Sequence, residues 1–107
     1  MIKKLTARGN GWFLNIPKPI IKLLGLNPET SSVQFKIINK ILYVKEIFPD
    51  NPDFDKYLVR KLSKKNSSRG LYMPNSILEL LEINPESDLI NIDVEDNVLI
   101  VKKNRQI

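Results

Sequence analysis

The feature of this sequence that most constrains its fold is an internal repeat. When the chain is aligned with itself at an offset of 57 residues, residues 4–45 match residues 61–102 without a gap. The triplet Asn27-Pro28-Glu29 recurs in register as Asn84-Pro85-Glu86, and most substitutions between the copies exchange one apolar residue for another. A unit of about 45 residues buries too little surface to fold alone. We therefore expect the two copies to share one core.

Each copy predicts the same order of elements, β-β-α-β-β. The first two strands of the copies are expected around residues 2–6, 12–16, 59–63 and 69–73. A loop rich in turn formers is expected between them, at residues 7–11 and 64–68. The last two strands of each copy are expected to form a hairpin, because apolar residues alternate with polar ones before Asn39-Lys40 and before Asp96-Asn97, which are the expected turns.

A short helix is expected after Pro17 in the first copy and after Pro74 in the second. Proline is tolerated in the first turn of a helix, and Asn75 or Ser76 is the expected N-cap in the second copy. The apolar stripes predicted to face the core are Ile20, Leu23 and Leu24 in the first helix and Ile77, Leu80 and Leu81 in the second.

These elements predict a mainly β protein with short helices that forms a single domain over residues 1–107. Repeat one is expected to span residues 1–47, an acidic linker residues 48–57, and repeat two residues 58–107. Each repeat has one apolar face and exposed strand edges, which the other repeat can cover. The aromatic residues Phe48, Phe54 and Tyr57 of the linker are expected to pack on the outside of the resulting barrel.

Several short motifs occur in a fixed order in the first copy and, with substitutions, in the second. They are Arg8-Gly9-Asn10-Gly11, Leu14-Asn15-Ile16-Pro17, Leu24-Gly25-Leu26, Asn27-Pro28-Glu29 and Ile41-Leu42-Tyr43-Val44. This ordered set resembles the AbrB/MazE (SpoVT-AbrB) swapped-hairpin family. In that family two such units, normally from two chains, interleave their hairpins into one barrel that binds DNA. The resemblance implies an AbrB-like swapped-hairpin β-barrel formed here as an intrachain pseudo-dimer, and a role as a transcription regulator or antitoxin.

Each loop keeps about half of the Arg-x-Gly-Asn-Ser pattern of the MazE-like branch of that family. The first loop keeps Gly9-Asn10 but has Ala7 at the basic position, whereas the second keeps the basic group as Lys64 and the hydroxyl as Ser68. The AbrB-like branch also has basic residues in the helix, and Lys22 matches them here. Because the two loops differ, we expect an asymmetric operator.

The chemistry of the loops predicts DNA binding independently of the resemblance. Phosphate contacts need cations together with small polar residues or free backbone N–H groups, and both loops provide them. If a pseudo-twofold axis places the loops side by side, their cations form one basic face from which polar groups reach base edges. The predicted DNA-binding residues are Lys4, Arg8, Asn10, Gly11, Lys61, Lys64, Lys65, Asn66, Ser67, Ser68 and Arg69. The alternative is that the charged loops are only solvated, and Trp12 is predicted to pack rather than to stack on a base.

The composition excludes several classes of function. The chain has no His and no Cys, which removes disulfides, thiolate or imidazole metal sites and the usual nucleophiles and general bases. We therefore expect no enzyme activity, no cofactor and no metal. The net charge is +5, and residues 1–45 carry eight Lys or Arg against Glu29 alone, which allows a polyanionic partner without requiring one. The partner predicted from the loops and the resemblance is double-stranded DNA. With neither a membrane-spanning run nor a secretory signal visible, we expect a cytoplasmic protein, either a monomeric pseudo-dimer or a homo-oligomer.

The linker supports a different class of function. Phe48 and Phe54 stand among Asp50, Asp53 and Asp55, a composition similar to that of the acidic tails with which MazE-like antitoxins bind their toxins. The alternative prediction is therefore an antitoxin or protein-interaction module that binds a toxin or another partner. Its predicted partner-binding residues are Phe48, Asp50, Asp53 and Phe54.

Overall fold

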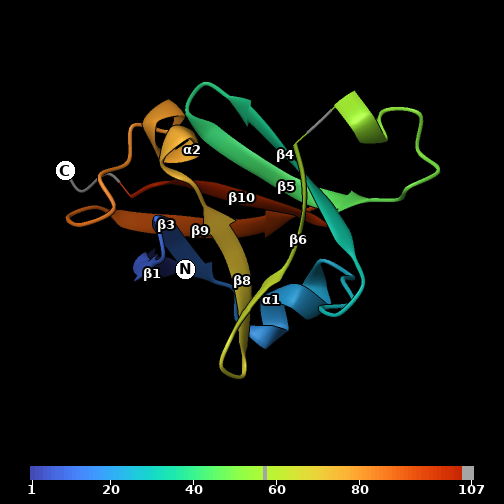
Figure 1. The fold of residues 1–107 in the computed structure, drawn as a ribbon, viewed down its shortest axis with the longest axis horizontal. Helices are drawn as coiled ribbons and strands as arrows, with labels where there is room; N and C mark the ends of the chain where they lie inside the picture. The colour runs from blue at the N-terminus through green and yellow to red at the C-terminus, as the bar shows by residue number, and fades with distance from the viewer. Residues whose placement is uncertain (57, 105–107) are drawn as a thin grey trace.

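Ten β-strands, two short α-helices and one 3₁₀-helix make up the computed structural model over the residues it describes, 1–56 and 58–104 (Figure 1). The predicted mainly β class with short helices is confirmed. One antiparallel sheet has six strands in the order β1 (Ile2–Lys4), β9 (Leu89–Glu95), β10 (Val98–Lys103), β5 (Ile41–Ile47), β4 (Ser32–Ile38) and β6 (Leu58–Lys61). The other has four, in the order β2 (Thr6–Arg8), β3 (Gly11–Asn15), β8 (Ser68–Met73) and β7 (Ser63–Lys65).

A pseudo-twofold axis maps each of the two sheets onto itself. The repeat offset converts β1, β4 and β5 into β6, β9 and β10, so exchanging the repeats turns each strand order into its own reverse. The strand registers agree with this symmetry. Leu14 pairs with Leu71 and Tyr43 pairs with Ile100, and the members of each pair are separated by the repeat offset itself. The pseudo-twofold axis therefore passes through these two pairs.

Each repeat contributes its first strand to the hairpin of the other repeat. Strand β1 pairs with β9, and its counterpart β6 pairs with β4. The chain then leaves the six-stranded sheet at Leu5 or Leu62 and enters the four-stranded sheet as β2 or β7. Both leucines are buried in the core, where each contributes about 1.5–3 kcal/mol to stability. Core packing thus fixes the point at which the chain changes sheets.

The predicted first strands and the loops that follow them differ from the structure. The expected strand at residues 2–6 is two strands that join at Leu5, and the expected strand at 59–63 is divided in the same way at Leu62. In place of the expected loops, the structure has the two-residue turns Gly9-Asn10 and Asn66-Ser67. The polar segments around these turns pair through their backbones, which hydrophobic alternation does not reveal.

The two predicted helices are confirmed as α1 (Lys18–Leu23) and α2 (Asn75–Leu80), but the predicted caps are wrong. The N-caps are Pro17 and Pro74, both with extended backbone, and neither helix has a side-chain cap. The φ angles of these prolines, −60° and −65°, agree with the value that the ring imposes. Neither Asn75 nor Ser76 therefore caps α2.

The predicted apolar stripes are also wrong at one position in each helix. Leu23 and Leu80 are each 60% exposed, whereas Ile21 and Leu78 are buried. The face turned to the core carries Ile21 and Leu24, three residues apart.

Both predicted C-terminal hairpins are confirmed. Asn39 and Lys40 have φ angles of 51° and 65°, and Asp96 and Asn97 have φ angles of 51° and 63°. Positive φ at both central residues is the conformation of a type I′ turn, whose twist matches that of the flanking strands.

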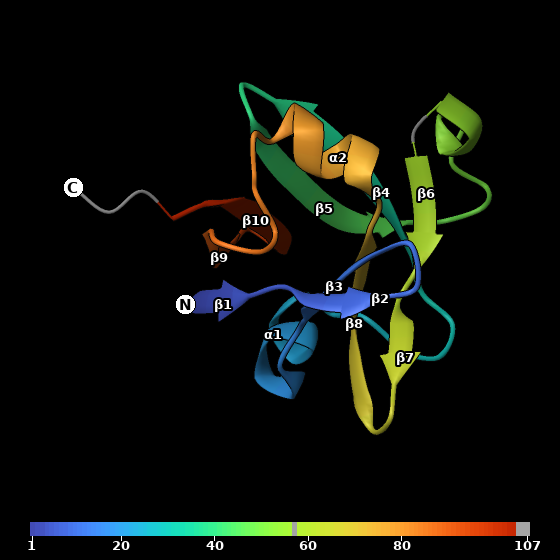
Figure 2. The same cartoon turned by 60° about the vertical axis from the view of Figure 1, so that its left-hand side comes forward.

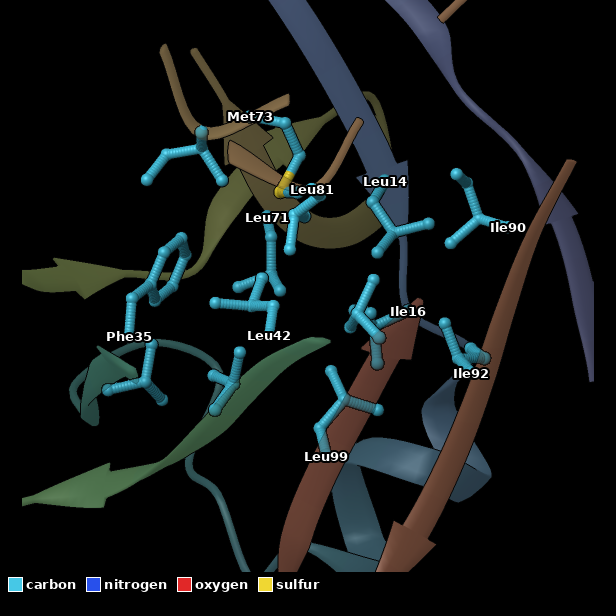
Figure 3. Packing of buried hydrophobic residues seen from close by; sticks show 14 of the residues in the cluster. Leu14, Ile16, Phe35, Leu42, Leu71, Met73, Leu81, Ile90, Ile92 and Leu99 are labelled. Atoms are coloured by element: carbon cyan, nitrogen blue, oxygen red, sulfur yellow. The ribbon is translucent and has the colours of Figure 1, made fainter. Parts of the chain in front are cut away.

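One hydrophobic core lies between the sheets and takes residues from both repeats (Figure 3). Leu14 and Leu71 enter it from the four-stranded sheet, and Leu42 and Leu99 enter it from the six-stranded sheet. All four are at most 1% exposed, and they form two pairs of pseudo-twofold counterparts. The two repeats therefore complete each other's hydrophobic core.

Within the described residues, the strands remain in two separate sheets and no closed barrel forms. The linker leaves β5 and forms a projecting loop that ends in the 3₁₀-helix η1 (Phe54–Lys56), at the upper right of Figure 1. Phe48 is 59% exposed rather than packed against the sheets, and Phe54 is half-buried. Tyr57 lies outside the described residues. Neither described helix is long and apolar enough to cross a membrane.

Candidate nucleic-acid interface

The two hairpin turns of the four-stranded sheet share one backbone conformation in spite of their different sequences. Gly9 and its counterpart Asn66 both have a φ of 56°. Asparagine tolerates this left-handed region better than most residues, so it can replace glycine there. Asn10, Ser67 and Ser68 are exposed at or beside the turns. The polar groups predicted to contact DNA are therefore accessible.

The structure divides the predicted basic residues of the hairpins between two faces of the sheet. Successive residues of a strand point to opposite faces, so Lys64 and Lys65 of β7 point in opposite directions. The register places Lys65 beside Ser68 on the face that also carries Arg8, whereas Lys64 lies beside Arg69 on the other face. We call the face with Arg8 and Lys65 the outer face, because the core leucines point the other way.

Phe13 lies at the centre of the outer face and is only 2% exposed. Its ring lies against Gly70, where an added Cβ would come within 2.7 Å of the Phe13 Cζ atom. Gly70 is the pseudo-twofold counterpart of Phe13. The Phe13 ring on one side of the axis thus occupies the space that a side chain at position 70 on the other side would need. Two identical chains lack this large–small pair, because both would carry the same residue at that position.

Arg8 and Lys65 are pseudo-twofold counterparts, and the structure brings them together over Phe13. The Arg8 Cζ atom is 5.5 Å and the Lys65 Nζ atom 5.9 Å from the centroid of the Phe13 ring, within the range of a cation–π contact. Lys65 Nζ also donates to the Thr6 hydroxyl at 3.4 Å.

Among the described residues, the cations over Phe13 have no acidic partner. Arg8 Nη1 is buried without a hydrogen-bond acceptor in the part of the chain that the structure describes. No carboxylate in residues 1–56 and 58–104 forms an ion pair with Arg8 or Lys65. An anion that binds near two like charges lowers the repulsion between them. The outer face can therefore accept a phosphate group.

The other face carries a groove between α1 and the β7–β8 hairpin. Its volume is about 840 Å³, within the range of about 300–1,000 Å³ that is usual for ligand sites. Apolar residues and four cations line it: Lys18, Pro19, Ile21, Lys22, Leu26, Pro28, Glu29, Lys64, Ser67 and Arg69. A smaller hollow of about 250 Å³ extends it past Asn15 and Ser68. We call this site the α1 groove.

Arg69 is held in place within the α1 groove. Its guanidinium forms an ion pair with Glu29, and its Nη1 donates to the carbonyl of Pro28 at 3.3 Å. These contacts tie the second hairpin to the turn after α1. Lys18, Lys22 and Lys64 are exposed and form no ion pair with any described residue. The groove therefore keeps three cations available for a ligand.

The pseudo-twofold counterpart of the α1 groove has none of its cations. The counterparts of Lys18, Lys22, Lys64 and Arg69 are Asn75, Glu79, Ala7 and Trp12. Trp12 packs against the core, as predicted, and the Asn75 side-chain amide donates to the Asn10 carbonyl at 3.4 Å. The two halves of the molecule are thus alike in backbone and opposite in charge at this position.

The two remaining predicted lysines lie apart from the hairpins and from each other. Lys4 ends β1 and Lys61 ends β6, and these strands are the opposite edges of the six-stranded sheet. Both residues are exposed. They lie at the ends of the two edge strands and do not join the cations over Phe13.

The predicted partner-binding residues lie in the projecting linker (Figure 2, upper right). Phe48 and Asp50 are exposed, whereas Asp53 and Phe54 are half-buried. The backbone N–H of Asp53 donates to the Asn51 side chain at 2.8 Å, which holds the linker in a turn. Phe48 is thus a large apolar side chain beside an acidic one on the surface.

Sequence reasoning does not single out Lys18 or Phe13, two residues that shape these sites. The signal for both is in the repeat alignment, where Phe13 stands opposite Gly70 and Lys18 stands opposite Asn75. Aligned residues of the two repeats that differ in size or charge therefore show where the two halves of the molecule differ, which the shared pattern does not.

No protein-family model matches the chain, and no curated protein or solved structure was found to be similar to it.

Proposed function

We propose that this chain is a single-chain counterpart of the AbrB/MazE swapped-hairpin dimers and that it binds double-stranded DNA as a transcription regulator. The fold part of the proposal is supported by the self-reversing strand orders and by the exchange of β1 and β6 between the repeats. The two short hairpins that meet at the pseudo-twofold axis correspond to the DNA-binding loops of that family.

The observation that carries the DNA-binding part is the convergence of Arg8 and Lys65 over Phe13. Cations held on a rigid apolar support, with small polar residues at the adjacent turns, suit contacts to the DNA backbone. Asn10 and Ser67 at the turns are placed to reach base edges or further phosphates. Because the turns differ in sequence, the two half-sites of the operator differ as well.

Fluorescence anisotropy with labelled duplex DNA from the promoter region of this chain's own gene tests the proposal. We expect tight binding at low salt, a steep loss of affinity as salt rises, and weaker binding by the Arg8→Ala, Lys65→Ala variant. The matched control is Lys45→Ala, Lys102→Ala, which removes the same charge from pseudo-twofold counterparts on the central strands of the other sheet. Absence of binding at low salt, or equal loss in both variants, would contradict the proposal.

A second candidate function is protein interaction through the linker, as in an antitoxin. The exposure of Phe48, 59%, next to the exposed Asp50 favours it, because a solvent-exposed aromatic ring with acidic neighbours is a common contact residue. A pull-down of the protein encoded beside this chain by wild type and by the Phe48→Ala, Asp50→Asn variant is the test. Equal capture by both proteins would reject the linker as the binding segment, whereas DNA affinity should be unchanged in the variant.

A further inference from the structure

We propose that the α1 groove binds the acidic linker, residues 48–55, of a second copy of this chain. The contact would join two different surfaces of this chain, one from each copy. It concerns self-association and does not depend on DNA binding.

The chemistry of the groove matches that of the linker. The groove offers Lys18, Lys22 and Lys64 without ion-pair partners among the described residues, next to apolar walls that include Ile21 and Leu26. Residues 48–55 carry three aspartates and two phenylalanines and have no Lys or Arg. Opposite charges steer such surfaces together, and burial of an aromatic side chain then stabilises the contact.

The exposed residues of the linker are those that the groove would accept. Phe48 is 59% exposed, and Asp50 and Asp55 are exposed as well. The Phe48 side chain can enter the apolar part of the groove while the carboxylates that follow it in the linker meet the surrounding lysines. Burial of the Phe48 ring removes from water the largest exposed aromatic surface of the described chain.

Linker and groove lie on different parts of the molecule. The linker projects at the upper right of Figure 2, whereas α1 and the tip of the β7–β8 hairpin lie at the bottom. A contact between two copies therefore joins two different surfaces, which is a heterologous contact that generates an open chain or a ring of molecules.

The pseudo-twofold comparison limits each molecule to one such groove. The counterpart site has Glu79 where the α1 groove has Lys22, and Trp12 where it has Arg69. Each copy then has one acceptor groove and one donor linker. This arrangement predicts head-to-tail association rather than a closed twofold dimer.

Complementation between two variants tests the proposal without nucleic acid present. Lys18→Glu, Lys64→Glu destroys the groove and keeps the linker, whereas Asp50→Asn, Asp55→Asn removes the charge of these two linker residues and keeps the groove. In sedimentation velocity at low salt, wild type should show a mass that rises above 12.4 kDa with concentration. Each variant alone should remain monomeric, and an equal mixture should form a dimer and nothing larger, because only one productive contact is left.

Two further variants, one a charge control and one at an aromatic residue of the linker, complete the test. Lys45→Glu, Lys102→Glu makes the same charge change as the groove variant on the central strands and should associate as wild type does. Phe48→Ala, at an exposed position that the fold tolerates, should weaken association at least tenfold. The proposal is overturned if wild type stays monomeric at high concentration, if either charge variant alone associates like wild type, or if the mixture stays monomeric.

Discussion

At position 70 a side chain has no room, because the Phe13 ring and the carbonyl of Leu14 occupy the space where a Cβ would stand. Gly11 is crowded in a related way by the ring of Tyr72, whose Cζ would lie 2.6 Å from an added Cβ. The obstacle at Gly70 includes backbone, whereas the obstacle at Gly11 is the end of a side chain that can rotate. The two glycines should therefore respond differently to the same substitution.

Gly70→Ala should lower the free energy of unfolding by about 1–3 kcal/mol or more, because the clash requires the strands to move apart. Gly11→Ala should lower the free energy of unfolding by less. In a protein that already carries Tyr72→Ala, Gly11→Ala should lower it no further. Urea denaturation of the variants measures these differences. Equal losses for Gly70→Ala and Gly11→Ala would show that the crowding near the axis is not as described.

Among the elements, α1 shows where a sequence pattern is sufficient and where it is not. Its start after Pro17 and its short length follow from local sequence, but the apolar positions 20, 21, 23 and 24 are compatible with more than one buried face. The structure buries Ile21 and Leu24 and leaves Leu23 in solvent. The choice depends on the angle at which the helix meets the sheets, which local sequence does not contain.

Truncation of α1 side chains tests this assignment. Ile21→Ala should destabilise the protein by about 2–5 kcal/mol, as is usual for a large residue removed from a core. Leu23→Ala should change stability by no more than about 0.5 kcal/mol, as at other exposed positions. Thermal or urea unfolding gives both values, and a larger loss for Leu23→Ala than for Ile21→Ala would reverse the assignment.

The hairpins show the same division between local and distant information. The turns at Asn39-Lys40 and Asp96-Asn97 and the alternating strands before them were predictable, because their pattern is contained in about a dozen neighbouring residues. The opposite directions of Lys64 and Lys65 do not follow from the sequence pattern, which predicts a loop at residues 64–68. That error placed Lys64 and Arg69 on the same basic face as Arg8, whereas the structure places them in the α1 groove.

For the whole molecule, the repeats depend on each other for their cores and for their edge strands. Strands β1 and β6 are each paired with a hairpin of the other repeat, and both repeats contribute leucines to the core. The sequence predicted this dependence from the length of the repeat. It did not predict that the two sheets remain separate or that one half keeps a basic groove that the other lacks.

Separate fragments test the mutual dependence. Residues 1–47 and 58–107 should each be unfolded alone, because neither buries enough surface, and should gain strand structure when they are mixed in equal amounts. Circular dichroism of each fragment and of the mixture is the measurement. A cooperative thermal transition in either fragment alone would contradict a shared core.

We propose that the paired cations of the outer face bind the DNA backbone, and the salt dependence of DNA affinity is the measurement that decides this. Each phosphate contact contributes about 0.9 to the slope of log affinity against log salt concentration. Arg8→Ala, Lys65→Ala should therefore reduce the slope by about 1.8 relative to wild type, whereas Lys45→Ala, Lys102→Ala should leave it unchanged. An unchanged slope in the Arg8→Ala, Lys65→Ala variant, or equal reductions in both variants, would contradict the claim.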